Sequence, residues 1–337
     1  MARVAGSSHH FGLAATTGPP KRATFDRHLA LAGDQTRVVL AVRRSLGESG
    51  RNAACGPISL AQVPEAALLT RVVTGLVLAP LVIWITLWLP KAVMLTILVA
   101  ATSRCVDELL RMYPELRPAD RVAVALLAAV LALSAVGGPL WFAIAVPLVP
   151  VVWLTICLAR PGDVAVAARR AALGSLGLGY VGTSCATMVA LFARSEPSGG
   201  SFDTGRGALL GVFIIVFAGD TGAYFAGRFF GRTKLYELIS PKKTREGAVG
   251  GLLASVAGAA VVRTLLLPQL GLAEALAIGA LCGAVGQVGD LAESLFKRAT
   301  GTKDSGNLLP GHGGLLDRVD GVLFAAPVLL AWLSLRA

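Results

Sequence analysis

The segment from Gly286 to Gly321 concentrates the side chains of this sequence that could do chemistry. It contains four Asp, one Glu, two Lys, two Arg and one His, although hydrophobic residues make up 55% of the whole chain. A charge inside or beside a bilayer is costly unless it is paired, binds an ion or faces water. Such a cluster in an apolar chain therefore indicates a functional site.

The first half of this segment has the spacing of a helix with one reactive face. Asp290, Ser294 and Lys297 lie at positions i, i+4 and i+7, which fall on one side of an α-helix. That face would present a carboxylate, a hydroxyl and an ammonium group. After Arg298, the Gly, Asn and Pro residues within 301–314 predict a loop, because they cannot continue a helix.

The second half of the segment could bind phosphate and a metal ion. The glycines around His312, at 311 and 313–314, leave backbone N–H groups uncovered, as in a loop that approaches a phosphate closely. A second helix near Asp317 would place Asp317 and Asp320 on one side. If the two helix ends face each other across the loop, Asp290 and Asp317 form the hard-oxygen pair that Mg²⁺ prefers beside substrate phosphates. Four basic side chains would offset the charge of an anionic substrate: Lys297, Arg298, Lys303 and Arg318.

A simpler interpretation of this segment is a solvated, salt-bridged loop between two membrane helices. Such a loop needs no Gly-His-Gly-Gly core. It also needs no helical face that carries Asp290 toward the apolar segment. We therefore favour a binding or catalytic site over a plain connector.

A second charged region begins at Asp220. Its carboxylate interrupts an otherwise apolar run, where an unpaired acid is expensive. The following loop, from Arg228 to Gly247, adds clustered basic groups with Ser and Thr hydroxyls, which suit a triphosphate. The alternatives are that Asp220 is a paired structural acid and that the loop contacts lipid headgroups.

The elements that must position these residues are apolar stretches of membrane-spanning length. With a mean hydropathy of +0.69, the chain is predicted to be an all-α, polytopic membrane protein with about nine transmembrane helices. The expected crossings are 72–89, 92–103, 122–136, 140–159, 171–193, 207–228, 248–267, 273–289 and 319–335. Residues 1–64 are predicted to be a disordered, basic cytoplasmic extension with one short helix near Thr36 to Leu46, followed by a membrane domain at 65–337.

The basic residues predict the orientation of these crossings. Nearly all Lys and Arg beyond residue 71 fall in four loops, at 104–121, 160–170, 228–247 and 297–318. An even number of crossings separates each loop from the next, so all four lie on one side, which the positive-inside rule identifies as cytoplasmic. The N-terminus would then be inside and the C-terminus outside. Within this scheme, 104–121 is a loop or an amphipathic helix on one face of the membrane, and a solvated connector is the favoured interpretation.

The same charges do not indicate nucleic acid as a partner. The net charge is +11, but no aromatic-interleaved basic face or zinc-type spacing accompanies it. Basic cytoplasmic loops and an anionic lipid surface account for the charge better. The five Cys are scattered singly, which predicts neither a disulfide framework nor a metal knuckle.

The charged motifs resemble those of a known family, the CTP:phosphatidate cytidylyltransferases, also called CDP-diacylglycerol synthases. The similarity is carried by Ser294-x-x-Lys297-Arg298-x4-Lys303-Asp304-x-Gly306-x3-Pro310-Gly311-His312-Gly313-Gly314-x-x-Asp317-Arg318-x-Asp320. Upstream, Asp220 to Arg228 and Ser240 to Gly247 resemble the family patterns D-[ST]-G-A-Y-x-x-G-R and S-P-x-K-T-x-E-G. The chain departs from the family at Lys242, where Gly is typical, and at Arg245, where Trp is typical, and both departures add charge to the loop.

This resemblance implies transfer of a cytidylyl group from CTP to phosphatidate, forming CDP-diacylglycerol and pyrophosphate in phospholipid biosynthesis. It implies a multi-pass protein of the cell (inner) membrane with its active site on the cytoplasmic face. CTP, phosphatidate and membrane lipids are the expected partners, nucleic acid is not, and a homodimer is left open. Mg²⁺ is expected on Asp290 and Asp317, with a second cation left open and with Asp220 and Asp320 supporting the ion.

The resemblance also marks the candidate site residues. The candidate catalytic residues are Asp290, Ser294, Lys297, Arg298, Lys303, Asp304, His312, Asp317, Arg318 and Asp320. The candidate cofactor-binding residues are Asp220, Ser240, Lys243, Thr244 and Glu246. His312 is expected to hydrogen-bond a phosphate or hold the glycine loop rather than abstract a proton, since the lipid phosphate is already largely ionised near neutral pH.

Two other classes of protein remain as alternatives. One is a related CTP-dependent membrane lipid enzyme, of the polyprenol kinase or CDP-archaeol synthase type. The Lys-Asp…Pro-Gly-His-Gly-Gly…Asp-Arg-x-Asp string favours phosphatidate over these substrates. The other is a secondary transporter, since charges in broken helices also mark ion pathways, but the first half of the chain contains no repeat of the Asp220 or Asp290 segments.

Overall fold

The computed structural model describes residues 77, 80–160, 162–196, 199–308 and 313–336. The predicted extension at 1–64, with its short helix near Thr36 to Leu46, lies outside the described residues. So do residues 72–76 and 78–79 of the crossing expected at 72–89. The described residues belong to one compact unit, Pro64–Ala337.

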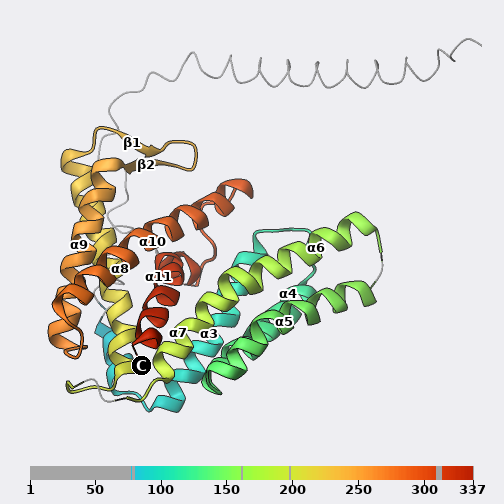
Figure 1. The fold of residues 1–337 in the computed structure, drawn as a ribbon. Coiled ribbons are helices and arrows are strands. Elements are labelled where there is room, and N and C mark those ends of the chain that lie inside the picture. Colours follow the sequence, from blue (N-terminus) through green and yellow to red (C-terminus); the bar gives the residue numbers. More distant parts are fainter. Residues whose placement is uncertain (1–76, 78–79, 161, 197–198, 309–312, 337) are drawn as a thin grey trace, which may run out of the picture. The chain divides into compact units, whose positions relative to one another are not determined.

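Helices make up most of the described chain (Figure 1). They include α3 (Lys91–Arg111), α4 (Pro118–Val136), α5 (Pro139–Ala159), α6 (Val164–Leu176), α7 (Thr183–Ala193), α8 (Thr204–Phe230), α9 (Arg245–Leu265), α10 (Leu272–Ala299) and α11 (Leu316–Leu335). A π-helical turn, Gly177–Gly182, joins α6 to α7. An antiparallel hairpin of β1 (Lys234–Tyr236) and β2 (Ser240–Thr244) departs from the all-α prediction. Pro241 within β2 disfavours a helix there, because proline lacks the N–H that a helix interior requires.

The described helices confirm a polytopic membrane protein. Seven helical segments are long and apolar enough to cross a membrane: Pro118–Val136, Pro139–Ala159, Val164–Ala193, Thr204–Phe230, Arg245–Leu265, Leu272–Ala299 and Leu316–Leu335. Two of the nine expected crossings are not among them. The crossing at 72–89 is described only in part, and the crossing at 92–103 lies in α3, which continues into the charged residues up to Arg111.

Two polar segments are largely helical: 104–121, expected to be a loop or an amphipathic helix, and 160–170, expected to be a loop. α3 extends through the first part of 104–121. α6 begins at Val164, inside the basic loop expected at 160–170, because Asp163 caps it by accepting a hydrogen bond from the backbone N of Val166 at 3.0 Å. Helix capping by a single carboxylate is a local signal that the hydropathy pattern does not reveal.

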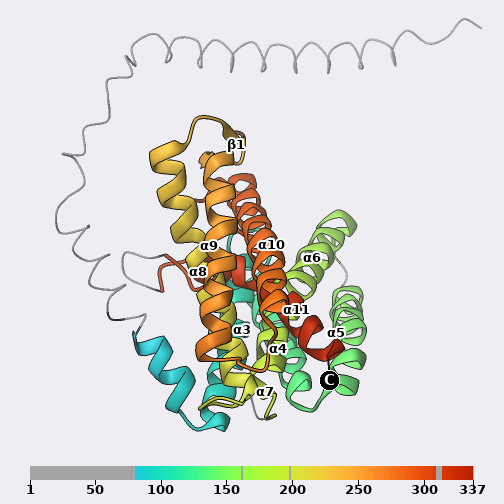
Figure 2. The ribbon, with the colours of Figure 1, turned by 60° about the vertical axis from the view of Figure 1, so that its left-hand side comes forward.

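Glycines allow α8, α9 and α10 to pack closely. A Cβ on Gly250 of α9 would lie 2.2 Å from the Cβ of Ala226 on α8, and one on Gly283 of α10 would lie 2.5 Å from the Cβ of Ser255 on α9. No side chain fits at such distances, so close contact requires glycine. Helix α9 consequently packs against both α8 and α10 (Figure 2).

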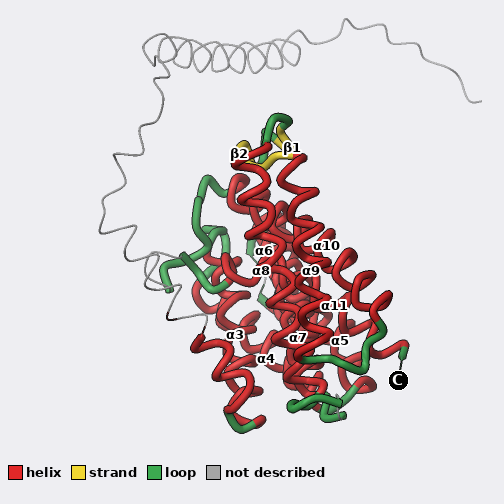
Figure 3. The backbone as a smooth tube through the Cα atoms, turned by 90° about the vertical axis from the view of Figure 1, so that its left-hand side faces the viewer, coloured by secondary structure: helices red, strands yellow, loops and turns green. Residues whose placement is uncertain are grey.

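The β1–β2 hairpin lies at one end of α8 and α9 (Figure 3). Its position is set by the first turn of α9. Thr244 caps this helix by accepting from the backbone N of Gly247 at 3.1 Å. The Glu246 carboxylate accepts from the backbone N atoms of Arg232 and Thr233, at 3.1 and 3.2 Å. These bonds hold the basic loop over the helix ends.

A buried ion pair joins α4 to α6. Arg170 donates from Nε and Nη2 to the two carboxylate oxygens of Asp120, at 2.9 and 2.6 Å. Asp120 is 1% exposed and Arg170 is 4% exposed. A bidentate geometry of this kind satisfies both buried charges, so this pair holds the fold at α4 and α6.

Candidate functional site

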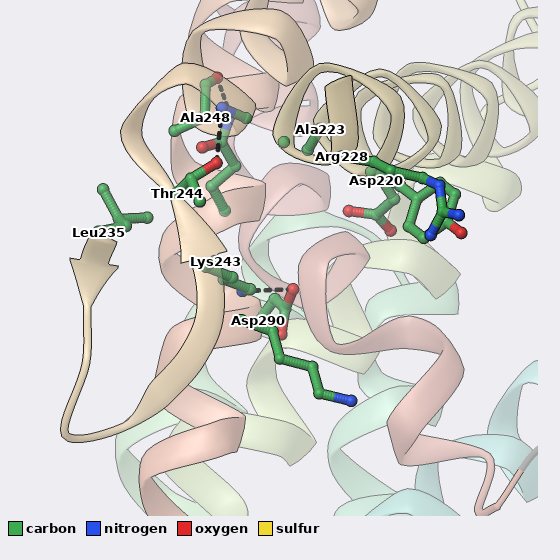
Figure 4. Close-up of a pocket in the computed structure, with 13 residues that line it drawn as sticks. Asp220, Ala223, Arg228, Leu235, Lys243, Thr244, Ala248 and Asp290 are labelled. Carbon is green, nitrogen blue, oxygen red and sulfur yellow. Dashed lines mark hydrogen bonds and ion pairs between the residues drawn. The ribbon is translucent and has the colours of Figure 1, made fainter. Parts of the chain in front are cut away.

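A pocket of about 430 Å³ lies where α8, the hairpin, the start of α9 and α10 meet (Figure 4). Its walls carry both signs of charge. Asp220 and Asp290 supply carboxylates, and Arg228, Lys242 and Lys243 supply positive charge. The pocket therefore joins the two charged regions that the sequence marked separately.

An ion pair crosses this pocket. The Nζ of Lys243, on β2, lies 2.5 Å from Oδ2 of Asp290, on α10 (Figure 4). The side chains are 27% and 33% exposed, so both remain accessible from the pocket. This contact links residues 47 positions apart in the sequence, and the helical face predicted for Asp290 does open toward the basic loop.

Three carboxylates from three helices interact electrostatically beside this ion pair. Asp220 of α8 interacts with Asp290 of α10, and Asp320 of α11 interacts with both of them. Lys243 and Arg318 supply opposing positive charge to Asp220. Acidic groups that repel one another in this way are stabilised by a cation, and carboxylate oxygens are the ligands that Mg²⁺ prefers.

Asp317 lies in a different set of contacts. Its carboxylate accepts from Nζ of Lys297 at 3.0 Å, from the backbone N of Ser305 at 3.0 Å and from the backbone N of Gly314 at 2.7 Å. The same lysine pairs with Glu293 at 2.5 Å. Asp317 therefore closes the loop between α10 and α11 onto Lys297.

The expected pairing of Asp290 with Asp317 stays a prediction that no contact among the described residues supports. Asp290 forms an ion pair with Lys243 and interacts electrostatically with Asp220 and Asp320. Nor do the described residues contain a ready group of three His, Cys, Asp or Glu side chains arranged to hold a metal. Asp220, Asp290 and Asp320 are thus a donor set that suits a cation chemically, without a preformed coordination shell.

The remaining candidate residues divide between the pocket, the hairpin and the loop. Thr244 lines the pocket as well as capping α9, whereas Glu246 bonds to the backbone of the hairpin. Arg298 donates to the backbone O of Ile239 at 3.3 Å and so ties α10 to the hairpin. Ser240, Ser294, Lys303, Asp304 and Arg318 do not line the pocket, while His312 lies outside the described residues.

Glu108 is a residue of this region that the sequence analysis missed. It was placed in a solvated connector, but it is 0% exposed. Its Oε2 accepts from the backbone N of Leu316 at 2.9 Å and from Oγ of Ser305 at 3.4 Å, and its Oε1 accepts from Nε of Arg104 at 3.0 Å. Glu108 therefore holds Ser305 of the described loop and the first residue of α11, Leu316, against α3.

Glycines make room for this buried carboxylate. A Cβ on Gly306 would lie 2.9 Å from Oε1 of Glu108, and one on Gly314 would lie 2.5 Å from Oε2. These two glycines belong to the charged motif, so part of their role is to let the loop approach α3. The only sequence signal for Glu108 was its i, i+4 spacing from Arg104, which a solvated helix would also show.

Comparison with known proteins places these features in a family. The model of the cytidylyltransferase family matches residues 69–335. A phosphatidate cytidylyltransferase of Brucella suis biovar 1 (strain 1330) is 46% identical over 153 residues, which cover 45% of this chain and 54% of that relative. A phosphatidate cytidylyltransferase of Staphylococcus saprophyticus is 47% identical over 121 residues, which cover 36% of this chain and 46% of that relative.

The aligned part of the chain spans about half the length of the curated relatives it matches. The family model reaches further, from before α3 to the end of α11, and therefore includes the pocket, the Glu108 contacts and the loop that Asp317 closes. Because the match extends over most of the sequence and over every element that forms the site, this chain belongs to the cytidylyltransferase family.

Proposed function

We propose that this protein transfers the cytidylyl group of CTP to phosphatidate and releases pyrophosphate. The observation that carries the proposal is the pocket in which Asp220, Asp290, Lys242 and Lys243 converge from α8, β2 and α10. The names of the relatives, phosphatidate cytidylyltransferase, agree with it. The family match favours this reaction over a transporter.

The reaction requires an anionic lipid phosphate to attack an anionic nucleotide. A phosphate oxygen of phosphatidate forms a bond to the α-phosphorus of CTP, and the bond between the α- and β-phosphates breaks. Pyrophosphate leaves with the electron pair. Because the lipid phosphate is already ionised, the site must mainly neutralise charge and align the two reactants.

The basic residues of the pocket suit this task. Lys242, Lys243 and Arg228 would contact the triphosphate, because ammonium and guanidinium groups form strong hydrogen bonds with phosphate oxygens. Lys243 is already positioned by Asp290. Lys242, which replaces the glycine typical of the family, adds a positive charge to the pocket wall.

Mg²⁺ fits the acidic side of the pocket. Asp290, with Asp220 and Asp320, would hold the ion, and the repulsion among these carboxylates would be relieved by it. When bound, the ion would supply positive charge to the phosphates of CTP. Asp317 contacts Lys297 and the backbone N of Gly314, and its share in binding the ion stays a prediction. A second cation on the same carboxylates stays a prediction.

The location of the site follows the same reasoning. We place the protein in the cell (inner) membrane, with nine crossings, a cytoplasmic N-terminus and the pocket at the cytoplasmic face. The basic loop from Arg228 to Gly247, which contains the hairpin and carries Arg232, Lys234 and Lys243, agrees with the positive-inside rule at this end of the helices. CTP could then enter from water and the lipid from the leaflet. A homodimer stays a prediction.

A direct assay tests this function. The full chain, purified in detergent, is mixed with radiolabelled CTP, phosphatidate and Mg²⁺, and lipid-linked CDP is measured beside Lys243→Ala and Asp290→Asn. Both variants are expected to lose most of the activity, whereas Arg111→Ala, an exposed basic residue outside the pocket, should retain it. Absence of labelled lipid with the parent chain, or full activity in both pocket variants, would refute the proposal.

A further inference from the structure

A second cavity, of about 320 Å³, lies between α9 and α10 and is called here the α9–α10 groove. Apart from Gln287, every residue that lines it is apolar, including Val249, Leu252, Ala284 and Val288. The groove shares Leu235, Ala248 and Gln287 with the charged pocket. The two cavities are therefore neighbours that meet at a common wall.

The helices themselves explain why the groove is there. Farther along the pair, glycine brings α10 against α9: a Cβ on Gly279 would lie 2.7 Å from the Cβ of Ala259, and Gly283 packs on Ser255 in the same way. Toward the hairpin, small side chains at Ala248 and Ala284 leave space between the helices. Gln287 bridges this space by donating to the backbone O of Ala248 at 3.0 Å. The groove thus ends where the helices touch and opens where the pocket begins.

The open side of the groove is apolar. Val249 is 59% exposed and Val288 is 54% exposed, and both belong to segments that can cross a membrane. Apolar side chains alone would say little, because any lipid-facing helix carries them. The informative feature is the junction, where the apolar α9–α10 groove meets the pocket that carries Arg228, Lys242 and Lys243.

We infer that the α9–α10 groove seats one acyl chain of the lipid substrate while the phosphate of that lipid occupies the charged pocket. The inference rests on the proposed function for the identity of the lipid. An amphiphile with an anionic head and an apolar tail matches the two cavities in charge and polarity. From Ala284 to Leu291 the groove follows about 10 Å of helix, so it would hold the part of the chain nearest the glycerol.

A substitution that fills the groove tests this inference. Ala284→Phe places a large ring in the groove from an exposed position, and Leu281→Phe, at an exposed residue that does not line it, is the matched control. The KM for phosphatidate in mixed micelles should rise about tenfold or more in Ala284→Phe, as expected when an apolar subsite is blocked. The KM for CTP should stay at the parent value, and Leu281→Phe should leave both values unchanged.

A binding measurement separates this inference from the proposed reaction. Phosphatidate with a photoreactive diazirine on its acyl chain should label peptides that contain Val249 or Val288 in the parent chain, and Ala284→Phe should reduce this labelling. If the parent shows no cytidylyl transfer, the proposed function fails, but labelling still reports on the groove. Transfer without labelling of these peptides, or an unchanged KM for phosphatidate in Ala284→Phe, would overturn the inference.

Discussion

Replacement of Glu108 should lower the stability of the fold and the proposed cytidylyl transfer without changing the residues of the pocket. The Glu108 side chain is fully buried and accepts three hydrogen bonds, from Arg104, Ser305 and the backbone N of Leu316. Through these bonds it holds Ser305, in the loop between α10 and α11, and the start of α11. Because Asp317 and Lys297 depend on the position of this loop, a loose loop should disturb the site from a distance.

The size of the effect can be worked out for Glu108→Gln, which keeps the shape of the side chain. Oε1 faces the Nε of Arg104 and Oε2 faces the backbone N of Leu316, so the new NH₂ group must face one of two donors. At least one hydrogen bond to a charged group is lost, which costs about 1.5–3 kcal/mol. Arg104 is 29% exposed and retains Asp107, so solvent should reduce the cost toward the lower end.

The assay measures both stability and turnover. Thermal unfolding in detergent and cytidylyl transfer are compared for the parent, Glu108→Gln, Ser305→Ala and the double variant. Because the Glu108 and Ser305 side chains are in contact, a double-mutant cycle should give a coupling energy of about 0.5 kcal/mol or more. Glu115→Gln, an exposed glutamate just after α3, is the matched control.

A clear result would refute this reasoning. If Glu108→Gln unfolds at the same temperature as Glu115→Gln and retains the same transfer rate, the buried carboxylate does not hold the loop. Loss of stability with unchanged kcat/KM would limit Glu108 to a structural role. Additive effects of Glu108→Gln and Ser305→Ala would show that the two side chains act independently.

Three further predictions follow from other parts of the structure. Lys242→Gly, which restores the residue typical of the family, should raise the KM for CTP about two- to fivefold, since an exposed charge pair contributes up to about 1 kcal/mol. An unchanged KM would show that this lysine does not take part in nucleotide binding. Asp320→Asn should raise the Mg²⁺ concentration needed for half-maximal activity about tenfold or more if the carboxylate cluster orients the ion, and a Mg²⁺ titration after chelation measures this shift. Asp120→Asn should destabilise the fold by about 3 kcal/mol, because it leaves buried Arg170 without a full charge partner. The KM for CTP, measured on the folded fraction, should remain that of the parent.

The sequence revealed the candidate site better than it revealed the contacts inside the site. Hydropathy located the apolar helices, and the charged motifs identified Asp220, Lys243 and Asp290, which the structure brings to one pocket. Helix ends were less predictable. α6 includes residues expected in a loop, and the sequence did not determine that α3 continues as a helix to Arg111, because capping groups and tertiary contacts, rather than hydropathy, decide where a helix begins and ends.

The expected partner of Asp290 shows why the contacts could not be predicted. The i, i+4 and i+7 spacing correctly placed Asp290 on a helical face, but spacing within one helix does not determine what faces it. The partner is Lys243 because glycines let α8, α9 and α10 pack closely enough to bring the hairpin over α10. Asp317 was expected from the sequence to lie beside Asp290. In the structure its carboxylate accepts hydrogen bonds from Lys297 and from the backbone N of Ser305 in the loop.

The amino-acid sequence alone determined the class of protein, its apolar helices and the residue types available for phosphate chemistry, since composition, hydropathy and motif spacing are properties of short stretches. Only the tertiary structure decided that Glu108 is buried against the loop, that Asp290 pairs with Lys243, and that an apolar groove opens beside the charged pocket. These features depend on how closely helices distant in sequence approach each other. That approach is set by the fit of side chains across their interfaces, which no single segment contains.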